Sequence, residues 1–284
     1  MSNTSLQVRE NAALILPATF LSTEALRSRG ITQRQLGELT GSGRLLRVRR
    51  GRYVDPRLSP LLISAAALGA RLDCISLLSA LGVFVRECAE VHVQLEMGAS
   101  RVPPRGSHVI GHWRRSSRGA CDLAADLIEA LAQACRCQSP RDAIATLDSA
   151  WHHGLIDEEG VAAVFARLPR RFRRLRPLLD KSAESGPETL VRLMLRMLGC
   201  RVETQVEIEG VGRVDLLVDG WLIVECDSRA HHSSWQERKR DMRRDLAAAA
   251  RGYTTVRPLA EDILTIPEQT QELLKRAISH GPRR

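Results

Sequence analysis

A chain of 284 residues, of which 44% are hydrophobic and 26% charged, is long enough for two or three compact domains with apolar cores. No apolar run reaches the roughly 18 residues that cross a bilayer, and neither a basic leader nor a small-residue cleavage site precedes the apolar stretch at 12–20. These features argue against a membrane segment and an export signal, so the sequence predicts a cytoplasmic protein with no membrane partner.

The formal net charge of +9 is concentrated at one end of the chain. Residues 1–58 contribute +6, residues 59–180 contribute +2 and residues 181–284 contribute +1. A basic N-terminal region favours a polyanion such as DNA as its partner, although a basic surface can also serve solubility alone. Seven cysteines without a Cys-x-x-Cys pair favour reduced thiols, and a metal clip at Cys135 and Cys137 is the less favoured interpretation because their spacing differs from common zinc sites.

The N-terminal region has the outline of a winged helix. Apolar positions at helical spacing predict short helices over 22–30 and 32–40, followed by a turn at 41–43 and a two-stranded ribbon over 44–54. In such a domain a helix can enter the major groove while the hairpin contacts phosphates. The arginines predicted to bind DNA are Arg44, Arg47, Arg49, Arg50 and Arg52. The alternative is a solvated hairpin whose arginines contact nothing specific.

A short resemblance accompanies this pattern. The stretch from Leu21 through "ITQRQLGELTGSGRLLRVRRGRYV" resembles the N-terminal winged helix of abortive-infection-type antitoxins. Its most recognisable part is the ending "RRGRYV" at 49–54. The resemblance implies a winged-helix fold at this end of the chain, with DNA as the partner.

The middle of the chain is predicted as a mixed α/β domain without visible chemistry. Its expected helices are 65–81, 121–135 and 143–151, and its expected strands are 91–96 and 107–112. An arginine-rich stretch at 167–176 can contact a DNA backbone or solvate a helix and linker, and both interpretations stay open. The histidines interpreted as structural or exposed, because no carboxylates surround them in sequence, are His108, His112, His152 and His153.

Three carboxylates in the last third of the chain can converge on a metal ion. Helices are expected over 187–198 and 237–251, and strands over 201–208, 212–218, 221–226 and 254–257. Hairpin pairing brings Asp215 and Glu225 to the same end of the sheet if the register is favourable, and Asp227 follows on the same side. Such oxygen ligands suit Mg²⁺, which would polarise a phosphate and activate water. The alternative is ion pairing with Arg213, Arg229 or Arg244.

Four motifs of this region occur in a characteristic order: "ESGPETLVRLML", "GRVDLLV", "WLIVECDSRAHH" and "DMRRDLAAAARGYTTVRP". They resemble the restriction-endonuclease-like fold, of the PD-(D/E)XK superfamily, found in very-short-patch-repair endonucleases. The resemblance implies a nuclease that uses Mg²⁺ or Mn²⁺ and acts in DNA repair or in defence against phage or other foreign DNA.

The resemblance also assigns residues to the site. Glu188 matches the family's helix carboxylate, Asp215 its central metal-binding aspartate, and Glu225 with Asp227 its Glu-x-Asp step. His231 lies where the family's histidine follows that step, and an imidazole there can act as a general acid or base. The expected metal ligands are Asp215, Glu225 and Asp227. Glu188 and His231 complete the expected catalytic set.

Further positions modify this assignment. Asp241, Arg244 and Asp245 match the family's helix motif, and His232 is the alternative to its neighbour as the catalytic imidazole. Ser228 departs from the family, which usually has glycine there, so turnover is in question if the backbone needs a positive φ or a close approach to DNA.

Together these observations predict an α/β (α+β) protein in three parts. They are a winged helix at 1–58, a mixed middle domain with a basic linker at 59–180, and a restriction-endonuclease-like mixed sheet flanked by helices at 181–284. The predicted function is metal-dependent hydrolysis or nicking of DNA phosphodiester bonds. The alternative is an antitoxin-type DNA-binding regulator that keeps a nuclease fold as a scaffold. RNA or branched DNA as the substrate, and the oligomeric state, stay open.

Overall fold

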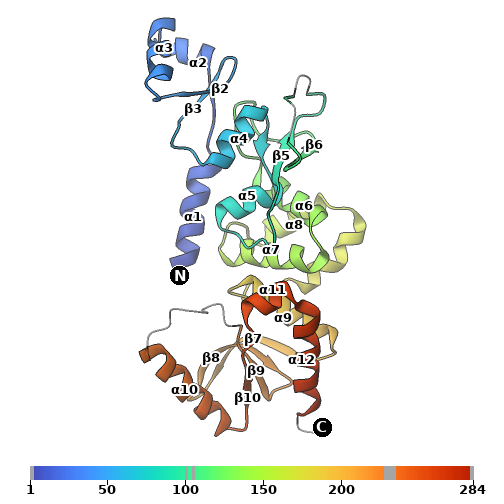
Figure 1. Ribbon diagram of the computed structural model, residues 1–284. Coiled ribbons are helices and arrows are strands. Elements are labelled where there is room, and N and C mark those ends of the chain that lie inside the picture. Colours follow the sequence, from blue (N-terminus) through green and yellow to red (C-terminus); the bar gives the residue numbers. More distant parts are fainter. Residues whose placement is uncertain (1–2, 100–101, 104–105, 227–234, 282–284) are drawn as a thin grey trace. The chain divides into compact units, whose positions relative to one another are not determined.

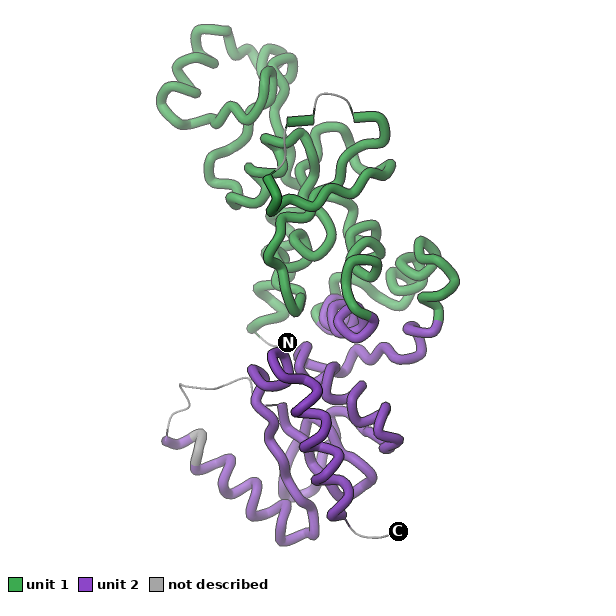
Figure 2. Tube along the Cα trace, turned by 45° about the vertical axis from the view of Figure 1, so that its right-hand side comes forward, with its two compact units in different colours: residues 1–139, 153–173 green, residues 140–152, 174–284 purple. Residues whose placement is uncertain are grey.

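A computed structural model describes residues 3–99, 102–103, 106–226 and 235–281, and it is a mixed α/β structure. The chain forms two compact units (Figure 2). Unit 1 consists of residues 1–139 and 153–173, and unit 2 of residues 140–152 and 174–284. Unit 2 therefore includes a segment that lies between two stretches of unit 1 in the sequence. The division into three parts after residues 58 and 180 stays a prediction.

Unit 1 carries two small sheets among its helices (Figure 1). Its helices are α1 (Asn3–Ile15), α2 (Thr23–Ser28), α3 (Gln33–Gly41), α4 (Pro60–Leu68), α5 (Cys74–Leu81), α6 (Leu127–Cys137) and α8 (Glu158–Ala166). One antiparallel sheet has the order β1 (Leu21–Ser22), β3 (Arg52–Val54), β2 (Leu46–Arg49). The other has the order β4 (Arg71–Leu72), β5 (Val91–Leu95), β6 (Val109–Trp113), with β5 and β6 parallel.

The first elements follow the order expected from the sequence, with two short helices and then a hairpin. Thr32 begins α3 with a capping box, because its side chain accepts the Gln35 N–H and the Gln35 side chain accepts the Thr32 N–H. Leu26 from α2, Leu36 from α3 and Tyr53 from the hairpin form their common core. The winged-helix fold itself stays a prediction.

Two expected helices of the middle region differ from the structure. The single helix over 65–81 is wrong, because Gly69 ends α4 in the left-handed conformation (φ 72°) and the short strand β4 separates it from α5. The helix over 121–135 is also wrong at its start. Residue Asp126 is the N-cap of α6, and its carboxylate accepts the backbone N–H groups of Ile128 and Glu129.

Unit 2 is a four-stranded mixed sheet with helices on both sides (Figure 1). The strand order is β10 (Thr254–Val256), β9 (Leu222–Val224), β8 (Gly212–Val218), β7 (Val202–Ile208), with β10 and β9 parallel and the other pairs antiparallel. The helices are α7 (Pro140–His152), α9 (Gly186–Met197), α10 (Trp235–Ala249), α11 (Ala260–Thr265) and α12 (Pro267–Ser279). The arginine-rich stretch forms most of the 3-10 helix η1 (Arg170–Leu178), which begins in unit 1 and ends in unit 2. Within the described part of the chain, no helix combines the length and apolar character needed to cross a membrane.

A buried ion pair joins α7 to α9. The side chains of Asp148 and Arg192 are 1% and 0% exposed, and the distance from Nη2 to Oδ2 is 2.7 Å. Thr189 Oγ1 donates to the same carboxylate oxygen, and the Asp180 N–H donates to the other. Burial outweighs these partners and raises the pKa of Asp148 to about 7. Removing either charge would leave the other buried without its partner, which is costly. The stability of unit 2 therefore depends on α7 as well as on α9.

Candidate functional site

The strand register of unit 2 places three polar residues at one level of the sheet. β7 and β8 pair Thr204 with Leu216 and Val206 with Val214, so Gln205 and Asp215 lie between these two pairs. β8 and β9 pair Leu216 with Val224, and the next position on these two strands is occupied by Asp215 and Glu225. This is the register that brings Asp215 and Glu225 to the same end of the sheet, as the expectation from sequence required.

Glu188 reaches this level from the first turn of α9. The Ser185 hydroxyl caps the helix by accepting the Glu188 N–H, and the Glu188 side chain is then directed toward the sheet. Its Oε2 accepts the Glu184 N–H at 2.9 Å and the Gln205 amide at 3.1 Å. The Gln205 side chain is also hydrogen-bonded to Asp215. Gln205 therefore connects the two carboxylates.

Both of these carboxyl groups are harder to ionise than usual. Burial, followed by the charge of Asp215, raises the pKa of Glu188 to about 7, and the residue is only 6% exposed. Burial also raises the pKa of Asp215, and the hydrogen bond from the Cys226 N–H to its Oδ2 (3.0 Å) offsets only part of this effect. A pair of oxygen ligands whose charges repel in a buried site fits a hard divalent cation.

Glu225 has a different environment. Its carboxylate pairs with Arg244 of α10 at 2.9 Å and with Arg257, which follows β10 and also pairs with Asp245. The alternative of an ion pair with Arg244 is therefore what the structure shows for Glu225. Burial still raises the pKa of this carboxyl group, against the effect of both arginines.

The expected metal ligands do not form a compact group on the described residues alone. Among the described residues, neither Asp215 nor Glu225 belongs to a group of three or more candidate ligands whose atoms lie within 4.8 Å of one another. Glu225 is paired with Arg244 and Arg257 instead. The remaining expected residues lie outside the described ranges; they are Asp227, Ser228, His231 and His232. The magnesium or manganese site and the full catalytic set stay predictions.

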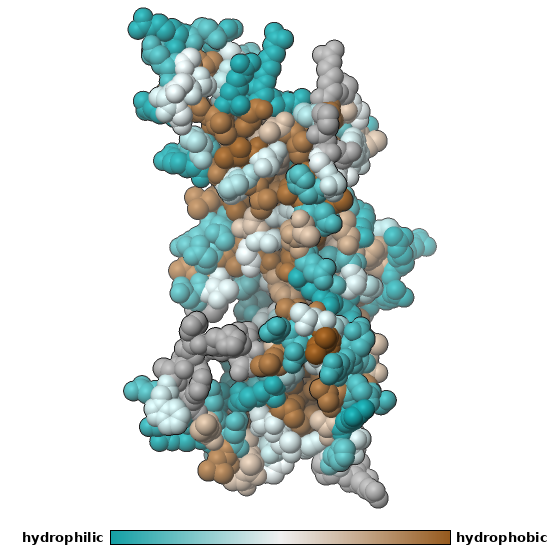
Figure 3. All heavy atoms as spheres, viewed as in Figure 1, coloured by the Kyte–Doolittle hydropathy of each residue, from teal (hydrophilic) through white to brown (hydrophobic). Residues whose placement is uncertain are grey.

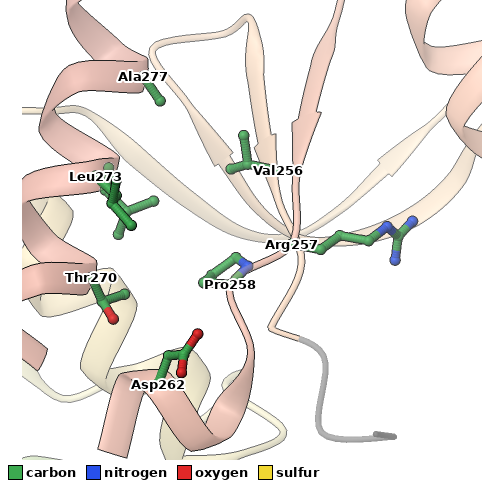
Figure 4. A pocket seen from close by; sticks show the side chains of 8 residues that line it. Val256, Arg257, Pro258, Asp262, Thr270, Leu273 and Ala277 are labelled. Carbon is green, nitrogen blue, oxygen red and sulfur yellow. The ribbon is translucent and has the colours of Figure 1, made fainter. Parts of the chain in front are cut away.

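A pocket of unit 2 lies apart from these carboxylates, none of which lines it. This pocket of about 200 Å³ lies between the end of β10 and the helices α11 and α12 (Figure 4). Leu273 and Ala277 of α12 line it, and the Arg257 side chain points away from them. Since Asp262 is its one acidic lining residue among those described, this pocket offers little catalytic chemistry.

The arginines predicted to bind DNA fall into two groups. Those that are exposed are Arg44, Arg47 and Arg50. Arg49 and Arg52 are half-buried and have structural contacts: Arg49 Nη1 donates to the Leu68 carbonyl at 3.0 Å, and the Arg52 guanidinium lies 4.5 Å from the centre of the Phe20 ring. The exposed group is therefore the better candidate for phosphate contacts.

A second constellation occurs in unit 1. One ligand atom from each of Cys74, His92, His112 and Cys137 lies within 4.8 Å of the others. Burial raises the pKa of the Cys74 thiol, whereas the hydrogen bond from Cys74, aided by the two imidazoles, lowers that of Cys137. Two thiols and two imidazoles are soft and borderline ligands, so this group differs in chemistry from the carboxylates of unit 2.

Comparison with known proteins adds no family to this geometry. Neither the scan against protein-family models nor the search of curated proteins found a match.

Several of these residues were not expected from the sequence. Gln205 belongs to no motif, and Arg257 lies within the motif at 241–258 but was given no role there. The importance of both residues depends on which strand positions face Asp215 and Glu225. His112 was interpreted as structural or exposed because no carboxylates surround it in sequence, and a metal clip at Cys137 was less favoured because its spacing from Cys135 differs from common zinc sites. The other ligands of the group are separated from both by long stretches of sequence. The sequence signal for this group was one histidine on each of two expected strands, His92 and His112. The strand register has to be known before this signal places the two imidazoles on the same face.

Proposed function

We propose that the protein is a metal-dependent DNA endonuclease whose active site lies in unit 2. The observation that carries the proposal is the pair of buried carboxylates, Glu188 and Asp215, which Gln205 connects and whose pKa values are raised. The succession α9, β7, β8, β9, α10, β10 supports the resemblance to a restriction-endonuclease-like fold. Mg²⁺ or Mn²⁺ is the cation that such a ligand set favours.

The residues have distinct roles in this proposal. Asp215 and Glu188 would hold the cation, with Asp227 as a further ligand on the expectation from sequence. The bound metal would polarise the scissile phosphate and lower the pKa of an attacking water. Gln205 keeps both carboxylates in place, and Arg244 and Arg257 neutralise Glu225 so that less negative charge repels an approaching phosphate.

The direct test is cleavage of supercoiled plasmid by the purified chain. We expect nicked or linear product with Mg²⁺ or Mn²⁺ and intact plasmid with a chelator, because the carboxylates alone cannot activate water for this reaction. Mismatched duplexes and RNA are parallel substrates that distinguish the substrate class. Intact nucleic acid under every metal condition would contradict the proposal.

DNA binding by the N-terminal hairpin is the second part of the proposal. In Figure 3 hydrophilic side chains gather over the region that Figure 1 labels α2, α3 and β2. The basic hairpin residues Arg44, Arg47 and Arg50 are exposed there, and the antiparallel pairing of β2 with β3 presents them from one short ribbon. An exposed basic ribbon is suited to phosphates, which supply affinity without reading sequence.

Replacing Arg44, Arg47 and Arg50 by alanine should weaken duplex binding similarly for every sequence. Each lost phosphate contact should reduce the slope of log affinity against log salt by about 0.9. Fluorescence anisotropy at several salt concentrations measures both effects. The matched control removes the same charge from exposed positions of unit 2, with alanine at Arg201, Lys275 and Arg276. An equal loss in both triple variants would contradict a specific role of the hairpin.

A DNA-binding regulator with an inactive nuclease fold is the second candidate function. The observation that favours it is the ion pairing of Glu225, an expected metal ligand, with two arginines. This candidate predicts duplex binding with a normal salt slope and no cleavage with any divalent metal. The plasmid and anisotropy measurements together therefore decide between the two functions.

A further inference from the structure

Four elements of unit 1 converge at one point. Cys74 begins α5, His92 lies on β5, His112 lies on β6 and Cys137 is the last residue of α6. Cys74 and His92 are buried, His112 is partly buried and Cys137 is exposed. The group thus has two ligands inside the fold and an open side at Cys137 through which an ion can enter.

The two histidines meet because of the register of the parallel strands. β5 and β6 pair His92 with Ile110 and Gln94 with His112, so the histidines are two positions apart on the same face of the sheet. His92 Nδ1 and His112 Nε2 are 3.0 Å apart, and the ring centres are 5.2 Å apart. His112 Nε2 also lies 3.9 Å from Cys137 Sγ.

The position of Cys74 is fixed by an unusual backbone. Its φ is 53°, a left-handed conformation that is strained for residues other than glycine and persists only where the surroundings impose it. Asp73, the preceding residue, is fully buried and its carboxylate is held by Arg114, two residues beyond His112. The Asp73 N–H also donates to the His92 carbonyl at 3.0 Å. The fold therefore maintains strain at a residue that contributes a thiol to the group.

The spacing of the ligand atoms suits a tetrahedral ion. With Zn–N bonds of about 2.0–2.1 Å and Zn–S bonds of about 2.3 Å, the edges of a tetrahedron are about 3.3–3.8 Å. The observed separations of 3.0 and 3.9 Å, with every ligand pair within 4.8 Å, lie close to these values. Small side-chain movements would complete the coordination.

We propose that Cys74, His92, His112 and Cys137 bind one zinc ion, which ties α5, β5, β6 and α6 together. Four protein ligands leave no position open for substrate, so the site is structural rather than catalytic. Two sulfur and two nitrogen ligands select zinc over Mg²⁺, which requires oxygen. The site is therefore separate in chemistry from the carboxylates of unit 2, and it does not depend on the nuclease activity.

Around the ligands, polar side chains support this coordination. The Gln133 amide donates to Cys137 Sγ at 3.3 Å, which stabilises a thiolate. The Gln94 amide donates to the Arg114 carbonyl at 2.7 Å and its oxygen accepts from Arg71, so side-chain hydrogen bonds hold the ends of β5 and β6. Such supporting contacts orient ligands before the ion binds.

The experiment measures metal content and unfolding temperature of the full chain purified from zinc-supplemented cells. We expect one zinc ion per chain, and a lower unfolding temperature after removal of zinc by a strong chelator, because zinc binds the folded state. Cobalt added to the reduced apoprotein should give the thiolate-to-cobalt and visible bands of a tetrahedral S₂N₂ site. Cys137→Ser and His112→Asn should each lose the zinc and the response to the chelator.

Matched controls come from the same unit. Cys121→Ser changes another exposed cysteine and His108→Asn changes an exposed histidine outside the group, and both should keep zinc. Because Cys137 is exposed at a helix end, its serine variant should fold, which circular dichroism checks. The proposal is overturned if the reduced protein takes up neither zinc nor cobalt, or if the ligand variants hold as much zinc as the controls. The proposal is also overturned if the protein as purified contains a Cys74–Cys137 disulfide and binds no metal once that disulfide has been reduced.

Discussion

Asp215→Asn should lower the rate of plasmid cleavage on the order of a hundredfold to a thousandfold while DNA affinity changes little. Asparagine keeps the shape and can still accept the Cys226 N–H, but it lacks the negative charge that holds a divalent cation. Because Asp215 lies in unit 2 and the arginine-rich hairpin lies in unit 1, binding and chemistry should separate. Single-turnover cleavage and anisotropy on the same preparations measure the two quantities.

The matched control for this variant is Asp262→Asn, which removes a carboxylate of unit 2 that lines the pocket beside α12. It should cleave like the wild type. Glu225→Gln should also reduce cleavage, but with a second effect, because it releases Arg244 and Arg257. If the Asp215 variant cleaves as fast as the wild type, the assignment of this residue to the metal site is wrong.

Glu188→Gln should increase the free energy of unfolding at pH 8 relative to the wild type, but not at pH 4. The pKa of Glu188 is raised from 4.5 to about 7 by burial and by Asp215, so the folded state holds a proton that the unfolded state has lost. The stability from this proton is present below the unfolded pKa and is lost as pH rises through about 7. At 1.36 kcal/mol per pKa unit, the loss is about 3 kcal/mol.

Urea unfolding at pH 4 and pH 8 in chelator measures this effect as the difference between variant and wild type. The pKa of Asp148 is also raised to about 7, but both proteins contain Asp148, so the comparison isolates Glu188. Mg²⁺ should restore stability of the wild type at pH 8 more than that of the variant, because a bound cation favours the charged carboxylate. A difference that is the same at both pH values would show that Glu188 ionises normally.

The sequence predicted the elements of the last third well because their boundaries have local causes. Gly212 and the turn at Asp219 and Gly220 delimit β8, and Pro187 with the Ser185 cap begins α9. The middle region was harder because alanine and leucine continue across Gly69, whose left-handed φ breaks the helix. Local composition does not show whether one glycine ends a helix or is tolerated within it.

The residues of the candidate sites also differ in how far the sequence indicated them. Asp215 and Glu225 follow from their strand positions, whereas Glu188 was found only through a family resemblance because a first-turn glutamate is common in helices. Gln205 and Arg257 acquire their contacts from strand register, which the sequence left open. The ligands of the proposed zinc site come from four separate elements, and no spacing rule for neighbouring ligands applies to them.

The buried pair of Asp148 and Arg192 determines where the polypeptide can be cut for separate production of its parts. A fragment that starts at residue 181, the boundary expected from sequence, would contain Arg192 without Asp148 and would expose the face of α9 that α7 covers. Such a fragment would carry an arginine charge in an apolar environment with no carboxylate beside it. A fragment that begins before Pro140 keeps this partner, but it also carries α8, which belongs to unit 1. The order of segments along the chain thus makes the two units difficult to express independently.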